Sequence, residues 1–287
     1  MNYKWRRVNK EFKCPICGKP DYCTVCPELD MVLCMRVASD KPSNCNLGGW
    51  IHRLNGAKVK TPPPPPPKPH INATQIMRDF WRHTTDRQRH ELAERLGVSV
   101  FSLRCLGASW AEAFRAWAFP MMDGYGNIVG VRLRSMSGFK WCITGSTTGV
   151  FLPIDLRPQP DVYITEGPTD TAAAITMGLF PIGRASCSSC VDQTITAVRR
   201  LRFERAVIVP DNDVDPVAAE ATMNGATKLS ENLPVPNCIT ILPGKDLRQF
   251  YRDGGTAQLL ESLTSSLVWV QPRHQREEMT TKTTTSF

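Results

Sequence analysis

Six consecutive prolines, Pro62 to Pro67, divide the chain into two parts. Proline lacks a backbone N–H and has a fixed φ, so this run can form neither a helix interior nor a central strand. It therefore predicts an extended polyproline II segment. At about 3.1 Å per residue, the segment would hold its neighbours roughly 20 Å apart. We expect a small module before a proline-rich linker at residues 59–70, and a larger part after it.

Cysteines are concentrated in the small module, where six of the eleven lie before residue 46. A local cluster is typical of a metal site, whereas secreted proteins spread disulfide-forming cysteines along the chain. Cys14 and Cys17 form a C-x-x-C knuckle, and the spacing to Cys34 fits the far side of a zinc ribbon. Candidates for the fourth ligand are Cys23, which with Cys26 makes a second C-x-x-C, Cys45 and His52. The sequence predicts a zinc-binding domain at residues 1–58, with an iron–sulfur cluster as the alternative group.

The formal net charge of +8 favours a polyanionic partner. Clustered Lys and Arg attract phosphate groups and release their condensed counterions. No apolar run approaches the ~18 residues needed to cross a bilayer, and the basic amino end lacks the apolar centre of a signal peptide. We expect a cytoplasmic protein without a membrane partner.

The part that follows the linker, residues 71–157, is predicted to be an α+β subdomain. Apolar residues recur at helical spacing up to a stop at Gly97. Two β segments, AWAFPMMD and IVGVRLRS, then flank the turn at residues 124–127 and predict a hairpin. Alternate residues Arg132 and Arg134 point to one face of a strand, where they can bind phosphate groups together. The alternative is two solvated charges on an edge strand.

Residues 158–271 alternate apolar, strand-like runs with helical stretches such as TAAAITMG. This alternation predicts a parallel, doubly wound sheet, in which catalytic groups lie at the carboxyl ends of the strands. The predicted strands are residues 162–165, 179–182, 206–209 and 238–242. The polar, Thr-rich residues 272–287 have no periodicity and are predicted to be disordered.

Acidic residues follow three of these four runs. They are Glu166 and Asp170 after the first run, Asp211, Asp213 and Asp215 after the third, and Asp246 after the fourth. Carboxylates that converge on one edge of a sheet repel one another unless cations bind, and hard oxygen ligands select Mg²⁺ or Mn²⁺. A single acidic residue after a strand is more often a helix N-cap or a solvated loop residue. The combination favours a metal site.

The segments EGPTD and DND resemble the TOPRIM domain that bacterial-type primases, topoisomerases and some nucleases share. The resemblance implies that Glu166 is a metal ligand or general acid/base, and that Asp211 and Asp213 bind the metal ions. It also implies that Asp170 and Asp246 support the same site. Asp215, close behind, is a further candidate ligand.

Residues 97–152 resemble the amino-terminal half of the bacterial primase polymerase core, through FPMMDGYGNIVGVRLRS and FKWCITGSTTGVF. This resemblance implies that Arg134 and Lys140 belong to a basic ridge that holds template or incoming nucleotide. Arg132 extends the ridge, and Lys245 joins the nucleotide-binding set from the loop before Asp246.

The stretches CPICGKPDYC, LCMR and GGWIHRL resemble the zinc-ribbon heads of some phage and plasmid primases. This resemblance favours Cys23 or His52 as the fourth zinc ligand. It departs from the replicative primase head, because Val37 stands where the last cysteine of that head would be.

The combined expectation is an α/β protein: a small β zinc ribbon, an α+β primase-core subdomain and a Rossmann-like TOPRIM domain. The expected function is DNA primase, which makes short RNA primers on single-stranded DNA by two-metal nucleotidyl transfer. Structural Zn²⁺ and catalytic Mg²⁺ or Mn²⁺ are the expected cofactors. Single-stranded DNA, ribonucleoside triphosphates and a separately encoded replicative helicase are the expected partners, since the resemblance ends near residue 271.

Two other functions stay open from the sequence. The first is a catalytically idle TOPRIM and zinc protein that binds single-stranded DNA as a replication factor. The second is a TOPRIM nuclease. A topoisomerase is disfavoured because the chain offers no large strand-gating region with a nucleophilic tyrosine, and helicase activity is disfavoured because no Gly-rich Walker loop is present. A phage, plasmid or other mobile-element origin is expected.

Overall fold

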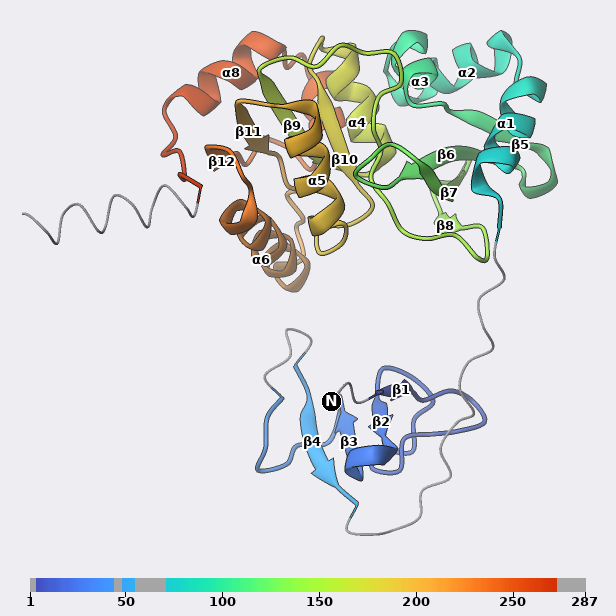
Figure 1. The fold of residues 1–287 in the computed structure, drawn as a ribbon, viewed down its shortest axis with the longest axis vertical. Helices are drawn as coiled ribbons and strands as arrows, with labels where there is room; N and C mark the ends of the chain where they lie inside the picture. Colours follow the sequence, from blue (N-terminus) through green and yellow to red (C-terminus); the bar gives the residue numbers. More distant parts are fainter. Residues whose placement is uncertain (1–3, 44–47, 55–70, 273–287) are drawn as a thin grey trace, which may run out of the picture. The chain divides into compact units, whose positions relative to one another are not determined.

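The computed structural model describes residues 4–43, 48–54 and 71–272. The chain divides into two compact units, residues 1–68 and 69–287 (Figure 1). Cys45, the predicted linker up to residue 70 and the predicted disordered tail from residue 273 onward lie outside the described residues. The finer domain boundaries that the sequence suggests stay predictions.

The small unit contains one four-stranded antiparallel sheet with a short 3-10 helix. In spatial order, which is also chain order, its strands are β1 (Arg6–Arg7), β2 (Thr24–Cys26), β3 (Met31–Cys34) and β4 (Trp50–Arg53). The helix η1 (Pro27–Leu29) connects β2 to β3. Three valines and three cysteines form most of its buried core. A core of this size gives a small unit little stability without a metal or another crosslink.

The larger unit begins with three helices, α1 (Ala73–His83), α2 (Asp86–Leu96) and α3 (Val100–Cys105). Each helix starts at a polar N-cap, as the helix-start signals require. The side chain of Thr85, for example, accepts the backbone N–H of Gln88, which completes a capping box at α2. Gly97 ends α2 with a φ of 69°, which confirms the predicted helix stop.

An antiparallel sheet follows, in the order β5-β6-β7-β8, and it confirms the predicted hairpin. Its elements are β5 (Ser109–Ala111), the 3-10 helix η2 (Glu112–Phe114), β6 (Ala116–Met122), β7 (Ile128–Ser135) and β8 (Lys140–Cys142). Every residue of β6 is buried. Ala116 and Ala118 face the core shared with α1, while Trp117, Phe119 and Met121 face the core shared with α3 and α4.

The second sheet is parallel throughout, in the order β10-β9-β11-β12, which confirms the predicted α/β fold. Its strands are β9 (Asp161–Glu166), β10 (Pro181–Arg184), β11 (Arg205–Ile208) and β12 (Asn237–Ile239). Its helices are α4 (Gly167–Thr176), α5 (Val191–Leu201), α6 (Pro216–Asn232), α7 (Leu247–Arg252) and α8 (Ala257–Ser265). Alternate strand residues face two separate cores, so helices cover both faces of the sheet (Figure 1).

The two sheets of the larger unit belong to one packed body. Phe151 exchanges two backbone hydrogen bonds with Gly183 of β10, at 2.7 and 2.9 Å. Apolar residues of β6 also share a core with α4. This packing holds the antiparallel sheet against the start of the parallel one. Within the described residues, no helix has the length and the apolar character needed to cross a membrane.

Candidate zinc group and carboxylate site

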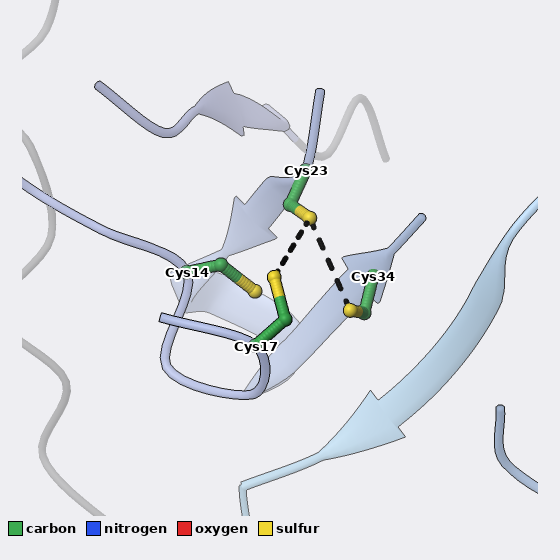
Figure 2. A group of neighbouring side chains, drawn as sticks. All are labelled: Cys14, Cys17, Cys23 and Cys34. Carbon is green, nitrogen blue, oxygen red and sulfur yellow. Dashed lines mark hydrogen bonds between the residues drawn. The ribbon is translucent and has the colours of Figure 1, made fainter. Parts of the chain in front are cut away.

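Four cysteine thiols converge in the small unit (Figure 2). Their Sγ atoms all lie within 4.8 Å of one another. The Sγ atoms of Cys17 and Cys23 are 3.7 Å apart, and those of Cys23 and Cys34 are 3.9 Å apart. Cys14 completes the group from the other end of the knuckle. Four sulfurs at about 2.3 Å from a tetrahedral zinc ion lie about 3.8 Å from each other, so the group fits zinc.

Backbone and side-chain donors surround these sulfurs. The N–H of Met35 donates to Cys23 Sγ and the N–H of Val37 donates to Cys34 Sγ, each at 3.4 Å. The Arg36 guanidinium lies 3.9 Å from the Sγ of Cys23. Such donors stabilise thiolates and orient them toward a metal. Burial and the neighbouring thiols raise the pKa of Cys23 to about 12, so a bound cation would be needed to hold this thiol ionised at neutral pH.

The structure distinguishes between the candidates for the fourth zinc ligand. Cys23 joins the group, whereas His52 does not: its Nε2 lies 3.0 Å from the carbonyl oxygen of Val37. The strand register explains this placement. Trp50 of β4 lies opposite Cys34, and His52 is two residues farther along the strand, which moves it about 7 Å from the end where the thiols meet. The thiol of Cys26 lies 3.5 Å from a Glu28 carboxylate oxygen and is also outside the group.

The second site lies at the carboxyl edge of the parallel sheet. Glu166 is the last residue of β9, and Asp211 follows β11. The N–H of Asn212 donates to the Lys245 carbonyl at 2.6 Å, which holds the loop after β11 against the loop that leads to α7. Asp246 is the N-cap of α7. The end of β9 and the loops that follow β11 and β12 therefore lie at one edge of the sheet, which is where a parallel sheet places its catalytic groups.

Asp170 lies beneath this edge, in the first turn of α4, and is only 5% exposed. Its Oδ1 accepts the backbone N–H of Arg248 at 3.0 Å, which ties α4 to α7. Burial, together with the charges of Asp246 and Asp211, raises the pKa of Asp170 to about 7. A carboxyl group in this position is difficult to ionise while the other carboxylates are charged.

The remaining carboxyl groups interact in the same way. Burial raises the pKa of Asp211 to about 7, with the charges of Glu166 and Asp246 adding to the shift. Burial also raises the pKa of Glu166, and the nearby charge of Asp213 contributes to it. Glu166, Asp170, Asp211, Asp213 and Asp246 lie near enough for their charges to influence one another's pKa, but among the described residues no three of them bring ligand atoms within 4.8 Å of one another. Oxygen donors that repel one another in this way suit a hard divalent cation such as Mg²⁺ or Mn²⁺.

Asp215 serves a different purpose from the predicted metal ligand. It is the exposed N-cap of α6, and its carboxylate accepts the N–H of Ala218 at 2.9 Å. The side chain is therefore directed at its own helix, which is the ordinary role of an aspartate in front of a helix.

A basic strand face borders the carboxyl groups. Arg134 of β7 lies opposite Lys140 of β8, and Arg132 lies opposite Cys142, so these side chains share one face of the hairpin. The Lys140 Nζ lies 4.0 Å from the position that a Cβ on Gly167 would occupy, next to Glu166. The positive charge of Lys140 also acts to lower the pKa of Asp211. The hairpin thus brings at least one ammonium group to the carboxylate edge.

Arg134 is partly buried at the same edge. Burial and the neighbouring guanidinium of Arg248 lower its pKa, against the opposing effect of Asp170 and Asp246. The guanidinium of Arg132 donates to Cys142 Sγ at 3.5 Å. Lys245 is exposed, and its backbone rather than its side chain joins the two loops.

Sequence reasoning missed Arg184, the last residue of β10. It is 2% exposed and lies opposite Glu166 in the parallel register. Its guanidinium donates to the carbonyls of Cys187 and Ser189, the latter at 3.0 Å, and its charge acts to lower the pKa of Glu166. The available signal was a charged residue at the end of an otherwise apolar strand, on the same edge as the acidic residues.

Comparisons with known proteins agree with this architecture. No protein-family model and no curated protein matches the chain. The E. coli primase catalytic core has 12% identity and a TM-score of 0.52, with 69% of this chain and 79% of that chain covered. A DnaG primase catalytic domain bound to ssDNA has 12% identity and a TM-score of 0.54, covering 69% and 78%. The zinc-binding and RNA polymerase domains of Aquifex aeolicus primase have 16% identity and a TM-score of 0.54, covering 69% and 60%. The chain therefore has the fold of primase catalytic cores.

Proposed function

We propose, from the fold shared with primase catalytic cores, that the protein is a DNA primase that joins ribonucleotides on single-stranded DNA. The observation that carries this proposal is the placement of Glu166 and Asp211 after two neighbouring strands at the carboxyl edge of a parallel sheet, with the Lys140 Nζ 4.0 Å from the Cβ position at Gly167, next to Glu166. Nucleotidyl transfer requires this combination: oxygen ligands for divalent cations next to positive charges for phosphate groups.

We assign the site as TOPRIM-type, with Glu166, Asp211 and Asp213 as ligands of Mg²⁺ or Mn²⁺. Bound cations would supply charge neutralisation at the triphosphate and lower the pKa of the attacking 3′-hydroxyl. Asp170 supports the site from below, because its hydrogen bond to the Arg248 N–H holds α7 in place. Asp246 connects the same helix to the carboxylate edge.

The basic strand face is assigned to the phosphate groups of template and incoming nucleotide. Arg132 and Arg134 of β7 and Lys140 of β8 share this face. Together they can contact consecutive phosphate groups of one extended nucleic-acid strand. Lys245 is added as a more peripheral contact because its side chain is exposed beside the loop of Asp211.

The small unit is assigned a structural Zn²⁺ bound by Cys14, Cys17, Cys23 and Cys34. The metal would add stability that the small buried core of this unit does not provide. Tyr22 is 63% exposed, and the Arg36 guanidinium lies 5.4 Å from the centroid of its ring. An aromatic ring next to a cation is suited to a base and its phosphate, so we assign single-stranded DNA to this surface too.

The biological context belongs to the same proposal. We infer that the protein makes short RNA primers in the replication of a phage, plasmid or other mobile element. A separately encoded replicative helicase would then be its partner.

Primer synthesis tests the proposal directly. Protein is incubated with single-stranded DNA, Mg²⁺ or Mn²⁺ and labelled ribonucleoside triphosphates. We expect short RNA products, which Asp211→Asn and Asp213→Asn reduce at least about 100-fold because each removes a charge from the site. Asp192→Asn, an exposed acidic residue in the first turn of α5, is the matched control and should retain wild-type synthesis.

Two outcomes would overturn the proposal. Cut DNA without RNA products would indicate a nuclease. Binding of single-stranded DNA with no new product under either cation would indicate a replication factor without catalytic activity.

A further inference from the structure

Two aromatic rings stack at the tip of the β7–β8 hairpin. The ring centroids of Phe139 and Trp141 are 5.5 Å apart, and their planes are inclined by 28°. Trp141 packs partly against the core that α1 forms with the antiparallel sheet, whereas Phe139 is 68% exposed. The tryptophan therefore supports the phenylalanine ring from one side, and much of the ring is open to solvent.

The hairpin that carries these rings also carries Lys140, which reaches toward the carboxylate site. Strand β8 is the edge strand of its sheet (Figure 1). Successive side chains of a strand point to opposite faces, so Phe139 and Trp141 lie on one face and Lys140 on the other. The Lys140 Nζ reaches within 4.0 Å of the Cβ position at Gly167, beside Glu166. The aromatic pair thus lies on the face of the hairpin opposite to Lys140, whose side chain reaches the carboxylate edge.

Positive charge lies against the same hairpin turn. The Arg95 guanidinium donates to the carbonyl of Met136 at 2.5 Å. A guanidinium nitrogen of Arg134 lies 3.7 Å from the position of a Cβ on Gly138. An exposed ring with two guanidinium groups nearby matches a ligand that carries both flat apolar faces and negative charges. Single-stranded nucleic acid has this chemistry, whereas a duplex keeps its base faces stacked internally.

We propose that Phe139, backed by Trp141, stacks against an unpaired base of a DNA strand that passes the carboxylate site, while Arg95 and Arg134 contact its phosphates. The identification of that strand as the template rests on the proposed function. The stacking site itself requires only single-stranded DNA.

Binding of the full-length protein to labelled single-stranded DNA, measured by fluorescence anisotropy, tests the inference. Base stacking on an aromatic side chain contributes about 1–3 kcal/mol, so Phe139→Ala should weaken binding by about 5- to 150-fold. Phe139→Trp keeps a flat ring and should retain wild-type affinity. Phe139→Leu keeps an apolar side chain without a ring and should bind as weakly as Phe139→Ala. Phe101→Ala, which removes a 58% exposed ring on α3, is the control and should leave the affinity unchanged.

Oligonucleotides with one abasic position separate stacking from indirect effects on folding. Moving the abasic position along the strand should reveal one place where wild-type affinity falls and Phe139→Ala affinity does not. Equal affinities of wild type and Phe139→Ala, or full rescue by Phe139→Leu, would overturn the inference. A wild-type protein that shows the stacking effect but makes no RNA would overturn the primase proposal and leave the stacking site standing. RNA synthesis with no effect of Phe139→Ala on DNA binding would overturn the stacking site and leave the primase proposal standing.

Discussion

Replacing Asp170 with asparagine should stabilise the protein above pH 7 when no divalent cation is added. Asp170 is almost fully buried, and its Oδ1 accepts the N–H of Arg248 at 3.0 Å. The Oδ1 of asparagine can accept the same hydrogen bond. Asp170→Asn therefore removes the charge and keeps the shape of the side chain.

The magnitude follows from the pKa. Burial, followed by the charges of Asp246 and Asp211, raises the pKa of Asp170 to about 7 in the folded protein, against about 3.9 in an unfolded chain. A group with a raised pKa gives its full stabilisation below the unfolded pKa, and that stabilisation is lost as the pH rises through the folded pKa. A shift of about 3 pKa units corresponds to about 4 kcal/mol. The loss accumulates between about pH 4 and pH 7 and levels off above it.

Urea unfolding of wild type and Asp170→Asn, followed by circular dichroism, gives the free energy of unfolding. Comparing the two proteins at each pH cancels contributions from the small unit. The variant should be more stable by about 4 kcal/mol at pH 8 and by less than half of that at pH 5. Added Mg²⁺ at pH 8 should narrow the difference, because cations relieve the repulsion in the wild type. A difference that stays constant between pH 5 and pH 8 would refute this electrostatic reasoning.

Three further predictions concern the metal, the packing and the basic face. Cys23→Ser should lose most of the bound zinc in elemental analysis and His52→Ala should keep it, because only the cysteine belongs to the thiol group; the opposite pattern would contradict this ligand set. Gly225→Ala should lower the free energy of unfolding by about 1–3 kcal/mol in a denaturation experiment. The added Cβ would lie 2.3 Å from the Cys187 carbonyl oxygen. A free energy of unfolding equal to that of the wild type would mean that the segment around Cys187 can move away without cost. Lys140→Met should reduce the slope of log affinity for single-stranded DNA against log salt by about 0.7, and an unchanged slope would place Lys140 away from phosphate.

The regular parts of the fold were predictable because their signals are local. The β6–β7 hairpin has apolar segments on both sides of a Gly-containing turn, and it forms as the sequence predicts. The runs that become β9 to β12 are short and apolar between helical stretches, which is how a strand buried on both faces appears in a sequence. Gly97 ended a helix because glycine adopts a positive φ without strain.

The site was predictable only as far as topology determines it. Parallel strands direct all their carboxyl ends to one edge, so the positions of Glu166 and Asp211 after two predicted strands place both residues at that edge. Asp215 has the same residue type and nearly the same position in the chain, yet it caps α6. The difference depends on where α6 begins, which spacing alone does not reveal.

What the sequence by itself determined is the periodicity of the elements, the cluster of cysteines and the edge on which the acidic residues lie, because these depend on neighbouring residues or on one topological rule. Only the tertiary structure decided which side chains touch. The register between β3 and β4 directs His52 away from the thiols, and the pairing of β9 with β10 places buried Arg184 opposite Glu166. Both results arise from hydrogen bonds between segments that are distant in the chain, where a shift of one residue would turn each side chain to the opposite face.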